Sequence, residues 1–118
     1  MPRFLMLIEL DENSIAPGVP SPEVHRRMGE LLEEMTRAGV LLDTAGLQPS
    51  AQGTRVRTEG GRITVVDGPF TETKEVVGGY AFLQCKDKAE AVEWSRRFLA
   101  AHGEELTFQL EVREVEEG

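Results

Sequence analysis

The stretch 3–10 (RFLMLIEL) constrains the fold most, because it is apolar at both alternating sets of positions. The apolar members are Phe4, Met6, Ile8 and Leu10 in one set and Leu5 and Leu7 in the other. A strand with one face in water alternates apolar and polar side chains, so this pattern predicts a central strand covered on both faces. The stretch 79–85 (GYAFLQC) has the same character, with Tyr80 and Phe82 on one face.

The remaining chain supplies two helices, a hairpin and two further strands. Ser21 followed by Pro22 is typical of a helix start, and apolar residues then recur at helical spacing until Gly39, a typical helix end. The other expected elements are a strand within 40–47, a hairpin over 54–67 that turns at Gly60-Gly61, a helix from Asp87 to about Ala101 and a strand over 106–115.

This order predicts an α+β fold, a ferredoxin-like βαββαβ sandwich with an inserted β-hairpin, in a single domain over 1–118. Two helices cover only one face of a four-stranded sheet. Because strands 3–10 and 79–85 are apolar on both faces, we expect a second copy of the same sheet to cover the other face. The sequence therefore predicts a homodimer through sheet faces.

The charge balance limits the partners. The 21 acidic and 13 basic side chains give a net charge of −8, which argues against duplex nucleic acid and against an anionic membrane surface. The last 16 residues contribute −5 of this charge. The polar face of the expected hairpin is instead basic through Arg55, Arg57 and Arg62, so a small anionic ligand or an acidic protein segment stays possible.

Several other classes are not expected. No run approaches the ~20 apolar residues of a membrane span, and no signal-peptide pattern is present, so we expect a cytoplasmic protein. We expect the single cysteine, Cys85, to be a small buried hydrophobic residue. Two distant histidines and scattered acids give no metal-ligand spacing, and no phosphate-binding loop motif occurs, so we expect neither a metal nor a cofactor.

The densest polar cluster lies over 67–80. Asp67 ends the apolar face of the expected hairpin, near Lys74 and Glu75, where a carboxylate can act as a general acid or base. We therefore name Asp67 as the candidate catalytic residue. The candidate ligand-binding residues are Phe70, Lys74, Glu75, Tyr80 and His25.

Plainer interpretations stand beside these. Asp67 can cap a turn while the residues after it form a solvated loop, since turns commonly use Asp, Gly and Pro for their geometry. His25, flanked by two arginines, is either a proton shuttle at the mouth of a cleft or a surface residue. The motif can also be purely structural and brace a dimer.

The same segment resembles a known family. The residues that carry the resemblance are Asp67-Gly68-Pro69-Phe70, Thr71-Glu72-Thr73-Lys74-Glu75 and Gly78-Gly79-Tyr80, with Ala38-Gly39-Val40-Leu41, Gly46-Leu47, Pro49 and Glu93-Trp94 elsewhere. They look like the signature of the DGPF subgroup of the YCII-related family. The resemblance implies a bacterial protein with a dimeric α+β barrel.

For function the resemblance implies less. The subgroup has no established general activity, and its proteins are often linked with alternative sigma factors. In the wider family a His on the first helix is thought to pair with an Asp for catalysis. Here Met28 occupies that position and His25 lies nearly a turn earlier, so chemistry would rest on Asp67 with Lys74, Glu75 or Tyr80.

Two functions follow as hypotheses. The first is a small-molecule pocket between the helix-free face of the sheet and the DGPF loop, serving acid–base chemistry of the lyase or isomerase type or ligand sensing. The second is a non-catalytic interaction or regulatory module, whose acidic edge binds a basic protein partner.

Overall fold

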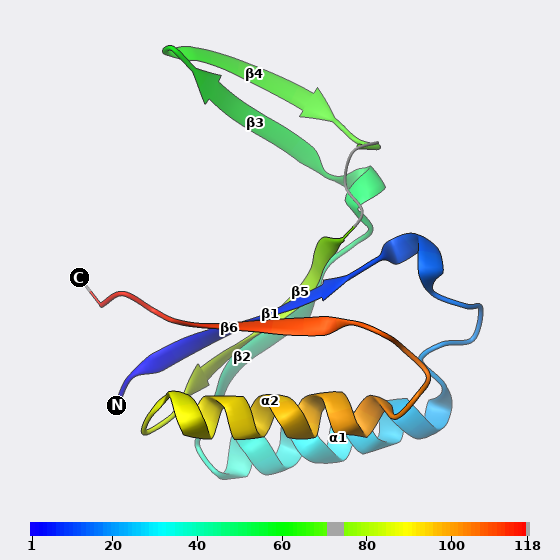
Figure 1. Ribbon diagram of the computed structural model, residues 1–118, viewed down its shortest axis with the longest axis vertical. Helices are drawn as coiled ribbons and strands as arrows, with labels where there is room; N and C mark the ends of the chain where they lie inside the picture. Colours follow the sequence, from blue (N-terminus) through cyan, green and yellow to red (C-terminus); the bar gives the residue numbers. More distant parts are fainter. Residues whose placement is uncertain (71–74, 118) are drawn as a thin grey trace.

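The computed structural model describes residues 1–70 and 75–117, which form an α+β body and a protruding hairpin (Figure 1). The body is a four-stranded antiparallel sheet with two helices on one face. The helices are α1 (Pro22–Arg37) and α2 (Lys88–His102). The strands lie in the order β2 (Leu41–Gly46), β5 (Val76–Gln84), β1 (Arg3–Leu10) and β6 (Gln109–Glu114). This arrangement is compatible with the expected ferredoxin-like fold.

The core lies between the sheet and the helices. Phe4 and Met6 of β1 are fully buried, as are Ala81 and Leu83 of β5, and Met35 of α1 packs against them. The four strand residues share the face of the sheet that the alternation predicts. The other face has no helix over it, and the apolar side chains at its centre are only partly buried: Leu5, Leu7, Tyr80 and Phe82. We call this surface the helix-free face.

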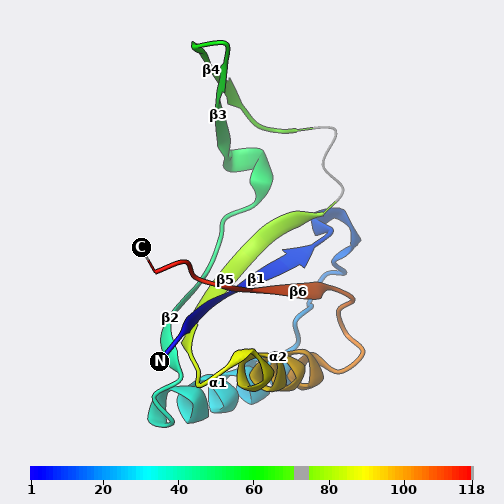
Figure 2. The same cartoon turned by 60° about the vertical axis from the view of Figure 1, so that its left-hand side comes forward.

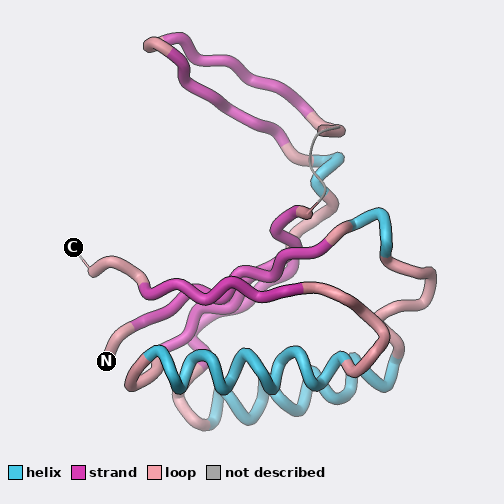
Figure 3. Tube along the Cα trace, viewed as in Figure 1, coloured by secondary structure: helices cyan, strands magenta, loops and turns pink. Residues whose placement is uncertain are grey.

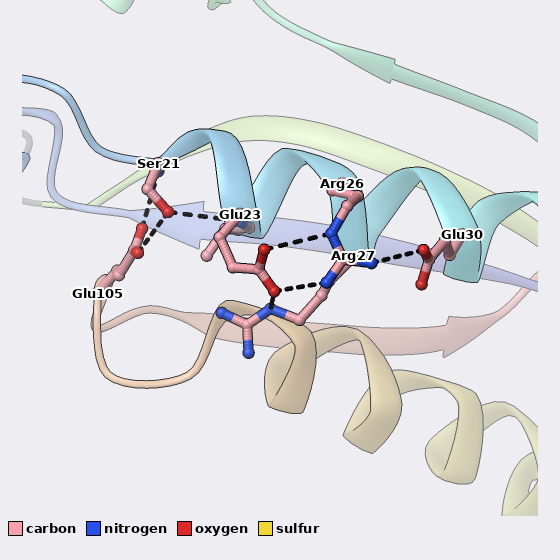
Figure 4. Close-up of polar contacts among 7 residues, drawn as sticks. Ser21, Glu23, Arg26, Arg27, Glu30 and Glu105 are labelled. Atoms are coloured by element: carbon pink, nitrogen blue, oxygen red, sulfur yellow. Dashed lines mark hydrogen bonds and ion pairs between the residues drawn. The ribbon is translucent and has the colours of Figure 1, made fainter.

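Both helices begin and end as the sequence predicts. The Ser21 side chain accepts a hydrogen bond from the Val24 N–H, and Gly39 follows α1 with a φ of 74°. Figure 4 shows the polar contacts at this helix start, where the Ser21 backbone N–H and hydroxyl also donate to Glu105 at 2.8 and 2.5 Å. These bonds lower the pKa of Glu105 and join the loop after α2 to the start of α1.

The strands β3 (Thr54–Glu59) and β4 (Arg62–Asp67) form a separate two-stranded sheet, which we call the arm. Val56 pairs with Val65 and Glu59 with Arg62, the register predicted for this hairpin. The arm lies on the side of the main sheet opposite the helices, as both views show (Figures 1 and 2).

Several bounds differ from the prediction. β5 begins at Val76 instead of 79, because β1 continues to pair with it beyond a bulge at Ile8/Glu9. β6 begins at Gln109 instead of 106, because Gln109 is the first residue of the segment that pairs with β1. Two short 3-10 helices, η1 (Glu12–Ser14) and η2 (Ser50–Gln52), lie outside the elements expected from the sequence (Figure 3).

Candidate functional site

The first candidate, Asp67, lies where the arm leaves the body. It pairs with Thr54 across the hairpin, and the Thr54 hydroxyl donates to its Oδ1 at 2.8 Å. The next residue continues this closure, since the Gly68 N–H donates to the Gly53 carbonyl at 2.9 Å. Asp67 is exposed to solvent. It therefore closes the base of the arm through a cross-strand side-chain bond.

Gly68 is required by the close approach of backbone. A Cβ built on it would lie 2.7 Å from the Ala51 carbonyl oxygen and 2.8 Å from that of Ser50. Both distances are far below van der Waals contact, so any side chain here would push η2 away. The close packing alone thus explains why a glycine occupies this position of the Asp-Gly-Pro-Phe segment, whether or not the protein catalyses a reaction. We call residues 50–53 and 68–70 the arm root.

Phe70 closes the other side of the arm root. The Arg55 guanidinium carbon lies 3.8 Å from the centroid of the Phe70 ring, which is a cation–π contact. The ring also lies beside Gly53, 3.8 Å from the position that a Cβ there would take. Phe70 is partly buried. The two residues form a stacked wall between the arm and the body.

Glu12 holds the arm root from the loop after β1. Its carboxylate accepts hydrogen bonds from the Ser50 N–H at 2.8 Å and from the Ser50 hydroxyl at 2.5 Å. The carboxylate is therefore a side-chain cap for η2, and the bonds involve a charged group, which strengthens them. The two residues lie 38 positions apart, and no local sequence signal joins them.

A hollow of about 550 Å³ opens between the arm root, the end of β2 and the start of β5. Its apolar surface comes from Leu47, Val76 and Val77, and its polar lining includes Gln48 and Gln52. The stacked pair Arg55 and Phe70 also lines it, as do Glu75, Pro49, Ser50, Gly53 and Thr54. Two of the predicted residues, Phe70 and Glu75, thus belong to one surface. Asp67 lies beside it through Thr54.

Tyr80 lies elsewhere, on the helix-free face. Its hydroxyl donates to Asp43 Oδ2 at 2.8 Å, and this bond raises the pKa of the phenol because it stabilises the protonated form. Asp43 follows a register shift in β2, which places its side chain beside the strand that carries Tyr80. Tyr80 therefore lies outside the hollow, in a pair with Asp43 that no sequence motif marks.

Two comparisons with known proteins place the chain in a family. A family model for the YCII-related domain matches residues 3–115. The chain belongs to the YCII-related domain family. Over 73 residues it is 33% identical to an uncharacterized protein of Rhizobium meliloti (strain 1021), a stretch that covers 62% of this chain and 59% of that relative. The chain thus spans less than two thirds of the relative's length, and neither description names a reaction or a ligand.

In this YCII-related protein, His25 does not join the hollow. His25 is an exposed residue of α1, on the opposite side of the sheet from the arm. Lys74 lies outside the described residues, as does the segment 71–73 before it. The other histidine, His102, is buried, and its Nδ1–H donates to the Phe98 carbonyl while its ring packs against Phe108. His102 thus belongs to the core.

The YCII-related chain offers little else of reactive character in its described parts. Burial raises the pKa of the Cys85 thiol to about 11, so the thiolate is disfavoured at neutral pH. Within residues 1–70 and 75–117, His, Cys, Asp and Glu side chains form no cluster of three or more that could hold a metal ion. In the same residues, no helix combines the length and apolar character of a membrane span.

Proposed function

We propose that this YCII-related protein is a member of the DGPF subgroup and binds a small molecule in the hollow at the arm root. The observation that carries the proposal is the lining: an apolar surface of Leu47, Val76 and Val77 next to the Arg55–Phe70 pair. Ligand sites commonly combine a mainly apolar wall with a few placed polar groups, in volumes of roughly 300–1,000 Å³. The hollow matches that description in both size and composition.

In this proposal Asp67 and Glu75 supply the carboxylates. Glu75 lines the hollow directly, whereas Asp67 meets it through the Thr54 hydroxyl. If the protein is an enzyme, Asp67 carries the proton of a lyase or isomerase reaction. If it is a ligand sensor, the same carboxylate only orients Thr54 in the wall. Both versions use the same hollow and differ in whether a bound ligand is turned over.

A fragment library screened by backbone amide chemical shifts tests the site. We expect binders to shift the amides of Leu47, Val76 and Val77, and Phe70→Ala to abolish these shifts. Val92→Ala, in a separate hollow between α2 and β6, is the matched control and should leave binding intact. Binders that shift only amides far from the arm root would refute the proposal.

Asp67→Asn then separates the two versions of the site. The amide keeps an oxygen that can accept from Thr54 but cannot carry the proton. Loss of turnover with ligand affinity unchanged would support an enzyme, and lower affinity without any turnover would support a sensor. Unchanged affinity and turnover would leave Asp67 only the structural role of closing the arm.

We further propose that the protein works as a homodimer through the helix-free face. Leu5, Leu7 and Phe82 are large apolar side chains that are only partly buried on a face without helices. A second copy of the same face would remove them from water. Sedimentation velocity should show a dimer that Leu7→Glu dissociates, while Leu99→Glu on the helical side should not. A monomer at all concentrations would contradict the homodimer.

A non-catalytic interaction module is the second candidate. The observation that favours it is the outer strand β6 and its tail, where Glu111, Glu114 and Glu116 are exposed. Such an edge would attract a basic protein partner, as in the regulatory setting that the subgroup's link with alternative sigma factors implies. Glu114→Lys with Glu116→Lys would abolish such an interaction, and Phe70→Ala would not. The reverse pattern would favour the hollow.

A further inference from the structure

The arm carries an apolar face that is largely exposed to solvent. Val56, Ile63 and Val65 are 67, 69 and 65% exposed. Val56 lies directly across from Val65, and Ile63 across from Thr58, so the register places them together on one face. Three β-branched side chains thus form one continuous apolar surface on a protruding element.

A hairpin of this kind does not hold its structure well by itself. Two strands without a further layer are marginally stable in water, because they bury too little apolar surface. The ends of the arm are secured by the Thr54–Asp67 bond and the Glu12–Ser50 bonds, but both of these lie at the root. The distal part of the arm therefore needs a covering surface.

We infer that a second copy of this chain covers the apolar face of the arm. The inference rests on the homodimer proposed above. The arm and the helix-free face lie on the same side of the main sheet (Figures 1 and 2). A copy seated on that face therefore comes within reach of the arm. In a two-fold dimer each arm would cross to the other body, so the contact is made twice.

The charge distribution selects a second body as the occupant. The arm, residues 54–67, holds three arginines against Glu59 and Asp67 and has a net charge of +1. The rest of the chain has a net charge of −9. The arm as a whole is therefore attracted to the acidic body of another copy and weakly repelled by another arm, while its three arginines lie on the face opposite Val56 and Val65 and leave the contact itself apolar. This pairing is self-complementary and closes after two chains.

The contact has a consequence for the hollow. Thr54 and Arg55 are the first residues of the arm and also line the hollow. When the arm lies on the second copy, this wall is fixed, so binding in the hollow and dimer formation are coupled. Such coupling is reciprocal: a ligand that prefers the fixed wall also strengthens the dimer.

Paired variants test the contact. In Ile63→Asp with Val65→Asp the charges lie on the apolar face, and in the control Thr64→Asp the charge lies on the opposite face of β4. We expect the double variant to raise the dimer dissociation constant by about 100-fold or more, and the control by less than about threefold. The body should keep its circular dichroism and melting temperature in both, which shows that the chain still folds.

Unchanged dimer affinity in the double variant, with a dimeric wild type, would overturn the inference and leave the homodimer intact. A monomeric wild type would overturn both. These two results are therefore distinguishable.

Mixed dimers locate the arm directly. A nitroxide attached through Thr64→Cys on one chain should broaden amide signals on the body of an isotope-labelled chain that carries no nitroxide. Native Cys85 is fully buried and stays unlabelled. Broadening confined to the chain that carries the nitroxide would mean that the arm folds onto its own body, and would overturn the inference. A sample labelled on both chains is the matched control.

Discussion

The body and the arm use similar residues with opposite results. In the body, Phe4, Met6 and Leu83 are fully buried between the sheet and two helices. In the arm, Val56, Ile63 and Val65 alternate just as regularly, yet about two thirds of each side chain faces solvent. Alternation therefore indicates which residues share a face, but a second layer must exist before that face becomes a core.

This contrast shows where the fold obtains its stability. The body buries its apolar residues within one chain and is complete on its helical face. The arm and the helix-free face stay incomplete, and both lie on the same side of the main sheet. The arm also contributes Thr54 and Arg55 to the hollow that we propose as the ligand site.

The largest expected effect contrasts a core truncation with an arm truncation. Phe4→Ala should lower the free energy of unfolding of the body by about 3–5 kcal/mol, because it leaves a cavity beneath two helices. Val65→Ala should change it by less than about 0.5 kcal/mol, because Val65 lies in the separate sheet of the arm and not in the core of the body. Urea denaturation followed by far-ultraviolet circular dichroism measures both. Equal losses would show that the arm belongs to the core.

The next effect is a pH dependence confined to the body. The folded state holds the Cys85 proton up to a pKa of about 11, against an ordinary value of 9.0. Above that ordinary value the unfolded thiol ionises and the folded thiol does not, so the unfolded state is favoured. Stability should therefore fall as the pH rises from 9 to 11, by about 2 kcal/mol attributable to this thiol. In Cys85→Ala this part of the slope should vanish.

A smaller effect concerns the arm root. In Gly68→Ala the new Cβ meets the carbonyl oxygens of Ser50 and Ala51. We expect the arm root to shift at a cost of about 1–3 kcal/mol, while the melting temperature of the body stays within a few degrees. Hydrogen exchange at the backbone amide of position 68, which donates to the Gly53 carbonyl in the wild type, measures the change. Protection equal to that of the wild type would mean that η2 accommodates a side chain.

The smallest effect tests the link between the loop after β1 and the arm. Glu12→Gln keeps the length of the side chain but removes the charge that accepts two bonds from Ser50. We expect a loss of about 1 kcal/mol at the arm root, since bonds to charged groups are the stronger ones. Exchange at the Ser50 amide measures it. Glu9→Gln, on the preceding strand, should leave that amide unaffected.

The sequence predicts local features of this fold well. The hairpin register follows from two glycines and the alternation on either side, and both were enough to place Val56 opposite Val65. The ends of α1 follow from Ser21 and Gly39 because caps are local chemistry. The faces of β1 and β5 also follow from alternation.

What the sequence does not predict are contacts between distant segments. The Glu12–Ser50 bonds and the Tyr80–Asp43 bond each join residues more than 35 positions apart, with no motif to mark either pair. The sequence offers His25 as a proton shuttle at the mouth of a cleft, whereas its helix and the strand that carries Asp67 lie on opposite sides of the sheet. The direction in which the arm leaves the body depends on the close approach of Gly68 to η2. Gly68 and η2 are distant in the sequence, so no local pattern predicts that approach.

In the dimer that we infer, a second copy of the chain completes the arm. Hydrogen exchange at the amides of β3 and β4 tests it, measured about tenfold below and about tenfold above the dimer dissociation constant. We predict that arm protection rises with concentration, while the amides of Met6 and Ala81 in the core stay equally protected. Arm protection that is the same at both concentrations would contradict the claim.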